Sequence, residues 1–209
     1  MIKQIPNLFT LLNLIAGCIA IIFILQTGEM LVTQTEEGAW VPQLPEKIWW
    51  GSFMIGIAAI VDFLDGFIAR LFRATSAMGG QLDSLADVIS FGVAPAALGF
   101  GAGLDGFWDC LVLAYFVACG VSRLARYNIT AEALAADASG KVKYFEGTPI
   151  PTSVVLVGVM AFAAWQGRIG ADVYGGHWIL GGLQLHPLVL LYLLSGSLMI
   201  SKTLRIPKL

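Results

Sequence analysis

Charged side chains are scarce in this sequence of 209 residues, because Asp, Glu, Lys and Arg together account for only 12% of it. A soluble globular domain carries about 25% charged residues. Hydrophobic residues account for 57% of the chain, and its mean hydropathy is +0.80. These values exclude an ordinary soluble domain, and the sequence has no basic face suited to nucleic acid. We expect an all-α polytopic membrane protein.

Cysteine and histidine are also few. Cys18, Cys110 and Cys119 lie in apolar runs at unrelated spacings, which indicates neither a disulfide framework nor a cysteine metal site. We interpret His177 and His186 as residues of the membrane interface rather than as ligands. A zinc site of the usual Cys/His kind is therefore not predicted.

What the sequence does contain is one acidic segment in apolar surroundings, DFLDGFIARLFRATSAMGGQLDSLAD, from residue 62 to residue 87. A charged side chain inside a membrane segment costs about 2.5–3.5 kcal/mol on insertion scales, so four carboxylates there indicate a function. Asp62 and Asp65 are three residues apart and Asp83 and Asp87 are four apart, so each pair lies on one face of a helix. Mg²⁺ and Mn²⁺ prefer carboxylate oxygens, and Mg²⁺ often completes its shell with substrate phosphates. The segment therefore predicts a site for Mg²⁺ or Mn²⁺, with ligands for two ions, that serves phosphoryl chemistry.

The spacing of the segment is D-x2-D-G-x2-A-R-x8-G-x3-D-x3-D, beginning at Asp62. It resembles the signature of the CDP-alcohol phosphotransferases in every fixed position. The resemblance implies a single membrane domain over residues 1–209 with six transmembrane helices. It also implies an enzyme that transfers a phosphatidyl or similar group from a CDP-linked donor to an alcohol, releasing CMP. A homodimer is a further implication of the resemblance.

The resemblance also implies roles for individual residues. Asp62, Asp65 and Asp83 bind metal, and Asp87 acts as the general base and can also contact metal. The residues implied in binding the CDP-linked lipid are Asp62, Gly66, Ala69, Arg70 and Gly79. In this register, the missing side chains of the two glycines allow the nucleotide to approach the backbone closely.

The run PNLFT, from residue 6 to residue 10, resembles the opening of the first helix in this family. Asn7 and Thr10 lie about one helical turn apart. One interpretation is that they cap the helix or form hydrogen bonds between helices. The other is that they border the CDP-lipid site, and the sequence leaves both interpretations open.

Six apolar segments are predicted to span the membrane. They cover residues 5–27, 48 to about 72, 81 to about 103, 107 to about 128, 149–166 and 178 to about 201. Gly79 and Gly80 precede the third span, and the last helix has a second possible start at His186-Pro187. Both aspartate pairs then lie near the same membrane surface. Ten of the twelve Lys and Arg residues lie on the side of the N-terminus, and only Lys47 and Arg168 lie on the other. Because cytoplasmic loops are enriched in Lys and Arg, we predict a cytoplasmic (inner) membrane protein whose aspartates and two termini face the cytoplasm.

Three further runs, FGVAPA, RLARYN and YFEGTPIP, resemble the members of the family that use CDP-diacylglycerol as donor and L-serine as acceptor. Arg123 and Arg126 in the second run are candidates for binding the serine carboxylate. The alternative is that both arginines are anchors on the positive side of the membrane. Glycerol 3-phosphate or an inositol phosphate would also require arginines, so these acceptors stay open.

Two other classes of membrane protein place carboxylates in apolar segments. A divalent-cation transporter would hold them near the bilayer midplane, often in two internal repeats, whereas this chain has one acidic segment at a surface. A prenyltransferase would typically have more spans and two separate aspartate motifs. We therefore favour the phosphotransferase.

Overall fold

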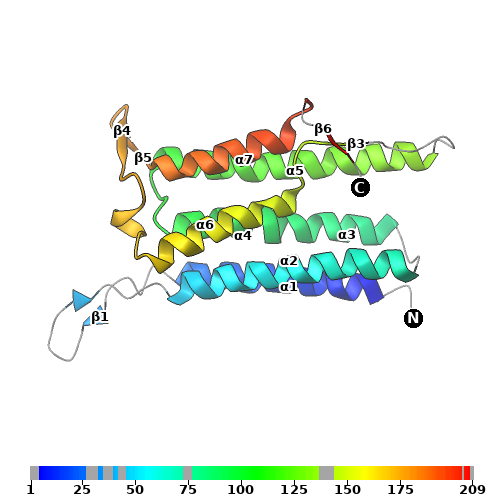
Figure 1. Ribbon diagram of the computed structural model, residues 1–209, viewed down its shortest axis with the longest axis horizontal. Coiled ribbons are helices and arrows are strands. Elements are labelled where there is room, and N and C mark those ends of the chain that lie inside the picture. The colour runs from blue at the N-terminus through cyan, green and yellow to red at the C-terminus, as the bar shows by residue number, and fades with distance from the viewer. Residues whose placement is uncertain are drawn as a thin grey trace.

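The computed structural model describes residues 5–26, 33–34, 40–41, 46–72, 77–136, 144–203 and 205–207 (Figure 1). The α-helices are α1 (Ile5–Leu25), α2 (Glu46–Phe72), α3 (Ala77–Asp87), α4 (Ala94–Gly101), α5 (Phe107–Ala136), α6 (Val154–Trp165) and α7 (Leu190–Ile200). Helix α1 packs along α2, α3 and α4 contact α1, and α5 packs against α7. The axes of the helices are roughly aligned with one another, as those of a membrane bundle are (Figure 1).

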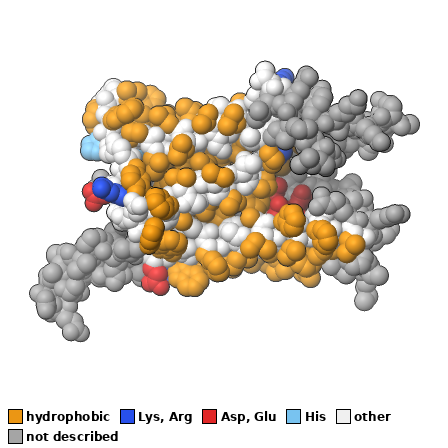
Figure 2. All heavy atoms as spheres, in the orientation of Figure 1, with side chains coloured by type: hydrophobic (Ala, Val, Ile, Leu, Met, Phe, Trp, Pro, Cys, Tyr) orange, Lys and Arg blue, Asp and Glu red, His pale blue; other side chains and the backbone are white. Residues whose placement is uncertain are grey.

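Four helical stretches are long and apolar enough to cross a membrane. They are Pro6–Leu25, Glu46–Ala69, Met78–Gly101 and Phe107–Thr130. Two shorter apolar stretches, Ile150–Trp165 and Pro187–Ile200, coincide with parts of the fifth and sixth predicted spans. Apolar side chains cover the middle of the flank, and charged side chains lie toward its ends (Figure 2). The prediction of a helical integral membrane protein is confirmed.

The third predicted span is a helix that changes its pitch midway. A π-helical segment, η3 (Val88–Val93), joins α3 to α4, and the N–H of Ala94 donates to the carbonyl of Ile89 five residues earlier. Pro95 has no N–H, and in an α-helix its ring would clash with the carbonyl four residues before it. The wider turn just ahead of Pro95 avoids this clash, and it begins directly after Asp87.

The sixth predicted helix begins later than Trp178. Strands β4 (Trp178–Leu180) and β5 (Leu183–Leu185) form an antiparallel hairpin joined by Gly181 and Gly182. These glycines have φ angles of +61° and +83°, the positive values that a tight two-residue hairpin turn requires. The prediction of helix from Trp178 is therefore wrong. The helical part starts with the 3₁₀ turn η6 (Pro187–Val189), next to the second predicted start, and continues as α7.

The remaining regular elements are short. Strand β1 (Thr33–Gln34) pairs with β2 (Trp40–Val41), and β3 (Tyr144–Glu146) pairs with β6 (Arg205–Pro207). Two further 3₁₀ turns are η4 (Ile150–Ser153), which leads into α6, and η5 (Gly170–Asp172). Several charges that contribute to the orientation prediction lie outside the described residues, namely Lys3, Arg73, Lys141, Lys143 and Lys208.

A buried Asp–His pair joins helices at the end of the bundle away from the acidic segment. Oδ2 of Asp109 lies 2.5 Å from Nδ1 of His186, and Oδ1 accepts the backbone N–H of His186 at 2.9 Å. Asp109 is fully buried and His186 is 6% exposed. His186 is therefore buried within the protein, whereas His177 is exposed.

Candidate metal centre

Asp62, Asp83 and Asp87 bring their carboxylates together between the second half of α2 and the second half of α3. One ligand oxygen from each lies within 4.8 Å of the other two. Asp87 is buried, and Asp62 and Asp83 are half-buried. Helix α2 runs toward one end of the bundle and α3 runs back from it, so Asp62, ten residues before the end of α2, lies level with Asp87, ten residues after the start of α3 (Figure 1). The structure thus brings together three of the four predicted metal ligands.

Asp65 lies on the same stretch of α2 but contacts α1. Its Oδ2 accepts a hydrogen bond of 2.8 Å from Oγ1 of Thr10. The carboxylate of Asp65 is not part of the group within 4.8 Å. The structure shows that Thr10 forms a hydrogen bond between helices, which was one of its two interpretations. Asn7 lies one turn earlier on α1 and is half-buried.

The oxygen atoms of this cluster are suitable ligands for a divalent cation. Oδ1 of Asp87 and Oδ1 of Asn13 are buried and have no hydrogen-bond partner among the residues that the structure describes. A buried acceptor without a donor is unfavourable. Two like charges 4 Å apart also repel each other by about 4 kcal/mol at an effective dielectric constant of 20. A divalent ion bound by the three carboxylates would offset their repulsion and give the buried oxygen of Asp87 a partner, and oxygen ligands are the ones that Mg²⁺ and Mn²⁺ prefer.

The two candidate arginines lie in different surroundings. Arg123 on α5 is half-buried and interacts electrostatically with Asp87, and its Nε is buried without a hydrogen-bond partner among the described residues. Nη1 of Arg126 instead donates to the carbonyl of Ile200 at the end of α7, at 3.4 Å. Arg123 therefore has a donor free near the cluster, while Arg126 already has one contact elsewhere.

A polar pair, Ser84 and Asn128, lies close to Asp87 and Arg123. Ser84 is three residues before Asp87 on α3, and Asn128 is five residues after Arg123 on α5. Nδ2 of Asn128 on α5 donates to Oγ of Ser84 on α3 at 3.0 Å. Oγ of Ser84 also lies 3.1 Å from the carbonyl of Gly80. The pair joins α3 to α5 next to the candidate acceptor residues.

The residues implied in binding the CDP-linked lipid lie on the same two helices. A Cβ added to Gly66 would meet no atom within 4 Å, so open space adjoins α2 directly after Asp65. Ala69 and Gly79 are half-buried. Arg70 lies in the last turn of α2, and its side chain is outside what the structure describes.

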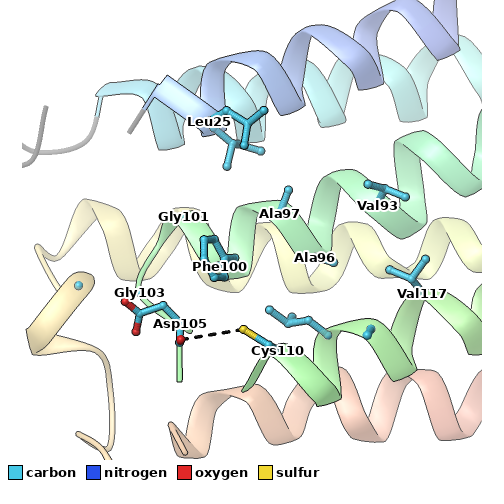
Figure 3. A pocket seen from close by; sticks show the side chains of 14 residues that line it. Leu25, Val93, Ala96, Ala97, Phe100, Gly101, Gly103, Asp105, Cys110 and Val117 are labelled. Atoms are coloured by element: carbon cyan, nitrogen blue, oxygen red, sulfur yellow. Dashed lines mark hydrogen bonds between the residues drawn. The ribbon is translucent and has the colours of Figure 1, made fainter. Parts of the chain in front are cut away.

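A separate cavity of about 500 Å³ lies toward the other end of the bundle, between α1, α4 and α5 (Figure 3). Its lining is mostly apolar and includes Leu25, Val93 and Phe100. Sγ of Cys110 lies 4.0 Å from the carbonyl of Asp105 at its rim. A diphosphate requires cations or many hydrogen-bond donors, so this cavity does not suit the charged part of a nucleotide.

Residues 3–194 match the family described as CDP-alcohol phosphatidyltransferase. The chain belongs to this family. CDP-alcohol phosphatidyltransferases depend in general on a divalent metal, which agrees with the acidic cluster between α2 and α3.

Relatives of this CDP-alcohol phosphatidyltransferase include enzymes named for serine. It is 45% identical over 166 residues to the CDP-diacylglycerol–serine O-phosphatidyltransferase of Saccharomyces cerevisiae, which covers 78% of this chain and 60% of that protein. It is 35% identical over 157 residues to the enzyme of the same name from Helicobacter pylori, covering 73% and 54% of the two chains. It is 36% identical over 118 residues to the archaetidylserine synthase of Methanothermobacter thermautotrophicus, covering 55% and 47%. The chain thus matches about half the length of these relatives.

Sequence reasoning did not identify Asn13 and Ser90, which contact each other beside the cluster: Oγ of Ser90 donates to the backbone carbonyl of Asn13 at 3.1 Å. Asn13 follows Thr10 by three residues, as Thr10 follows Asn7, so a polar stripe on the first helix was a usable signal. Ser90 is a single serine in an apolar run and gave no such signal.

Proposed function

We propose that this protein transfers the phosphatidyl group of CDP-diacylglycerol to the hydroxyl of L-serine, giving phosphatidylserine and CMP. The observation that carries the proposal is the convergence of the Asp62, Asp83 and Asp87 carboxylates, with Oδ1 of Asp87 unpartnered among the described residues. The serine acceptor is supported by the names of the relatives from yeast and Helicobacter pylori.

We propose that Asp62, Asp65, Asp83 and Asp87 hold two Mg²⁺ or Mn²⁺ ions. When bound, the metal supplies positive charge that binds the pyrophosphate and stabilises the charge developing on the CMP leaving group. Three of these carboxylates already lie together, and Asp65 lies one turn after Asp62 on α2, with its Oδ2 bonded to Thr10 of α1.

The CDP-lipid is proposed to lie along the ends of α2 and α3, where Asp62, Gly66, Ala69, Arg70 and Gly79 line its path. The open space beside Gly66 supports this placement, because a backbone without a Cβ lets a nucleotide approach closely. Asn7 and Thr10, at the start of α1, complete the proposed donor site.

Arg123 and Arg126 are proposed to bind the carboxylate of serine. A guanidinium presents several N–H donors in a plane that matches a carboxylate. The unpartnered Nε of Arg123 near Asp87 supports this role, because a carboxylate held there would place the serine hydroxyl toward Asp87.

Asp87 is the proposed general base. Its carboxylate takes the proton of the serine hydroxyl while the hydroxyl oxygen forms a bond to the β-phosphorus of CDP-diacylglycerol. The bond from that phosphorus to the bridging oxygen breaks, and CMP leaves with the bridging oxygen. An alcohol is a weak nucleophile at neutral pH, and general-base catalysis typically contributes about 10²–10⁴-fold to the rate.

The proposal also covers location and assembly. The Lys and Arg distribution supports a cytoplasmic membrane protein with both termini and the carboxylates on the cytoplasmic side. Resemblance to the family supports a single domain over residues 1–209 and a homodimer.

The acceptor is tested by assaying the purified protein with CDP-diacylglycerol, Mg²⁺ or Mn²⁺, and one alcohol at a time. We expect L-serine to drive release of CMP and formation of phosphatidylserine. Glycerol 3-phosphate, inositol and inositol 1-phosphate serve as comparison acceptors. Release of CMP with one of these alcohols and not with serine would overturn the serine assignment and leave the reaction type intact.

A further inference from the structure

We infer that α1 aligns the two halves of the metal centre: Thr10 positions Asp65, Asn13 positions Asp62, and Ser90 positions the segment that follows Asp87. This inference rests on the proposed metal site. The four carboxylates come from two helices, one pair on α2 and one on α3. Helix α1 is hydrogen-bonded both to the α2 pair and to the segment that directly follows Asp87.

The first contact runs from α1 to α2. Thr10 is 4% exposed, and its hydroxyl has a single hydrogen to donate. Oδ2 of Asp65 lies 2.8 Å from Oγ1, whereas the alternative acceptor, the carbonyl of Pro6, lies at 3.2 Å. A hydrogen bond to a charged carboxylate is shorter and stronger than one to a neutral carbonyl, so Thr10 holds Asp65 in a defined orientation.

The second contact lies one turn further along α1. Asn13 is fully buried, and its Nδ2 lies 3.5 Å from Oδ1 of Asp62, at the outer limit of a hydrogen bond. Its own Oδ1 has no partner among the described residues. The side chain of Asn13 is therefore placed against the metal-ligating carboxylate rather than used in a closed network within the helix.

The third contact runs from α1 to the π-helical segment after Asp87. Ser90 is fully buried, and its Oγ donates to the backbone carbonyl of Asn13 at 3.1 Å. A Cβ at Gly17 would lie 2.3 Å from Oγ of Ser90 and 2.9 Å from its Cα. Only glycine at position 17 allows the two helices to come this close. The contact therefore fixes the position of η3 along the axis of α1, and with it the position of Asp87, three residues before Ser90.

These contacts connect the carboxylate pair of α2, and the segment that directly follows Asp87, to one turn of α1. The carbonyl of Asn13 accepts from Ser90, while the side chains of Asn13 and Thr10 meet Asp62 and Asp65. Partners of metal ligands typically change metal affinity by about 10–100-fold when they are removed, because they set the orientation of the ligand atoms. Helix α1 therefore holds the ligands on α2 and those on α3 at fixed positions relative to each other.

The test measures Mn²⁺ binding to the purified full-length protein in detergent by electron paramagnetic resonance, without donor or acceptor. We expect Thr10→Val and Ser90→Ala to raise the dissociation constant for Mn²⁺ about ten-fold or more. We expect Thr10→Ser, which keeps the hydroxyl, to stay close to the unchanged protein. Ser52→Ala is the matched control, because Ser52 is also a buried serine on a helix packed against α1 but has no hydrogen-bond partner among the described residues.

A second readout separates positioning from general loss of structure. In the CMP-release assay, the two variants are expected to raise the half-saturating Mg²⁺ concentration and to leave the apparent KM for serine unchanged. Unaltered Mn²⁺ affinity in Thr10→Val and Ser90→Ala would overturn the positioning role and leave the metal site standing. Loss of Mn²⁺ affinity in Thr10→Ser or Ser52→Ala as well would also overturn it, and no Mn²⁺ binding by the unchanged protein would overturn the metal site itself.

Discussion

At the scale of single residues, Asp87 differs from the other three aspartates of the acidic segment in two properties. One of its buried carboxylate oxygens has no hydrogen-bond partner among the described residues, and its carboxylate interacts electrostatically with Arg123. It is 7% exposed, as is Asp65. Asp62 and Asp65 are each approached by a side chain of α1. These two properties support the proposed role of Asp87 as the general base.

Asp87→Asn tests this role, because asparagine keeps the shape of the side chain and cannot take the proton. We expect turnover to fall by about 10²–10⁴-fold, while CDP-diacylglycerol still binds in the presence of metal. Turnover is measured as CMP release and binding as retention of labelled lipid. The matched control is Asp105→Asn, since Asp105 is exposed at the other end of the bundle. Near-normal turnover in Asp87→Asn would remove Asp87 from the base role.

The sequence predicted the carboxylates better than their partners, for a physical reason. Four aspartates in an apolar segment are costly enough to indicate a function, and their helical spacing indicates which ones share a face. Ser84, Ser90 and Asn128 are single polar residues, and small polar residues are ordinary packing elements between membrane helices. Only the contacts between helices show which of them lie beside the site.

At the scale of helices and turns, the Asp109–His186 pair joins the first turn of α5 to the residue before η6. The Asp109 carboxylate accepts the N–H groups of Gly106 and His186 at 2.9 Å each, besides its contact with the imidazole. Asp109 therefore supplies the acceptor for every one of these buried donors. The pair fixes how α7 enters the bundle alongside α5.

Asp109→Ala would leave these donors buried without an acceptor. A buried donor left without an acceptor typically costs about 1–3 kcal/mol, so we expect a clear loss of stability in denaturant titrations of the purified protein. Affinity for Mn²⁺ should change little in the folded fraction, because the pair lies at the opposite end from the carboxylates. Asp105→Ala is the control for loss of a carboxylate at the exposed surface nearby. Equal stability of the two variants would show that the pair does not hold α5 and α7 together.

Hydropathy located the apolar segments but not their local geometry. The π-helical turn before Pro95 and the hairpin at Gly181-Gly182 depend on backbone effects of one or two residues, which an average over about 19 residues conceals. In the run ILGGLQL, residues 179–185, the Gly-Gly pair predicts a hairpin, whereas the apolar composition of the same run predicts a membrane helix. Turn chemistry prevailed there because two adjacent glycines favour a tight turn over a helix.

At the scale of the whole molecule, the described helices form a bundle with an apolar flank and one carboxylate cluster at one end (Figure 2). The class of fold followed from composition and periodicity alone, because only helices or closed barrels satisfy backbone hydrogen bonds inside a membrane. Orientation depends instead on where Lys and Arg lie relative to the spans. It stays a prediction, and it can be tested independently of activity.

Cysteine labelling in intact bacterial cells tests the orientation. In a background that lacks Cys18, Cys110 and Cys119, we expect His177→Cys to react with a membrane-impermeant maleimide. Thr130→Cys should react only after the cells are permeabilised, because position 130 lies toward the carboxylate end of α5. Both positions are exposed in the structure, so accessibility on the protein itself is matched. The reverse pattern would place the carboxylates on the outer side.

The central claim is that the carboxylates of α2 and α3 act by holding a divalent metal during transfer to serine. The most direct measurement is the rate of CMP release by the purified protein, with CDP-diacylglycerol and L-serine, as free Mg²⁺ or Mn²⁺ is varied. We expect no release in excess EDTA, a saturable return of the full rate when metal is added back, and no return in Asp83→Asn, which lacks one of the clustered carboxylates. A full rate in EDTA, or an Asp83→Asn variant with the metal dependence and rate of the unchanged protein, would contradict the claim.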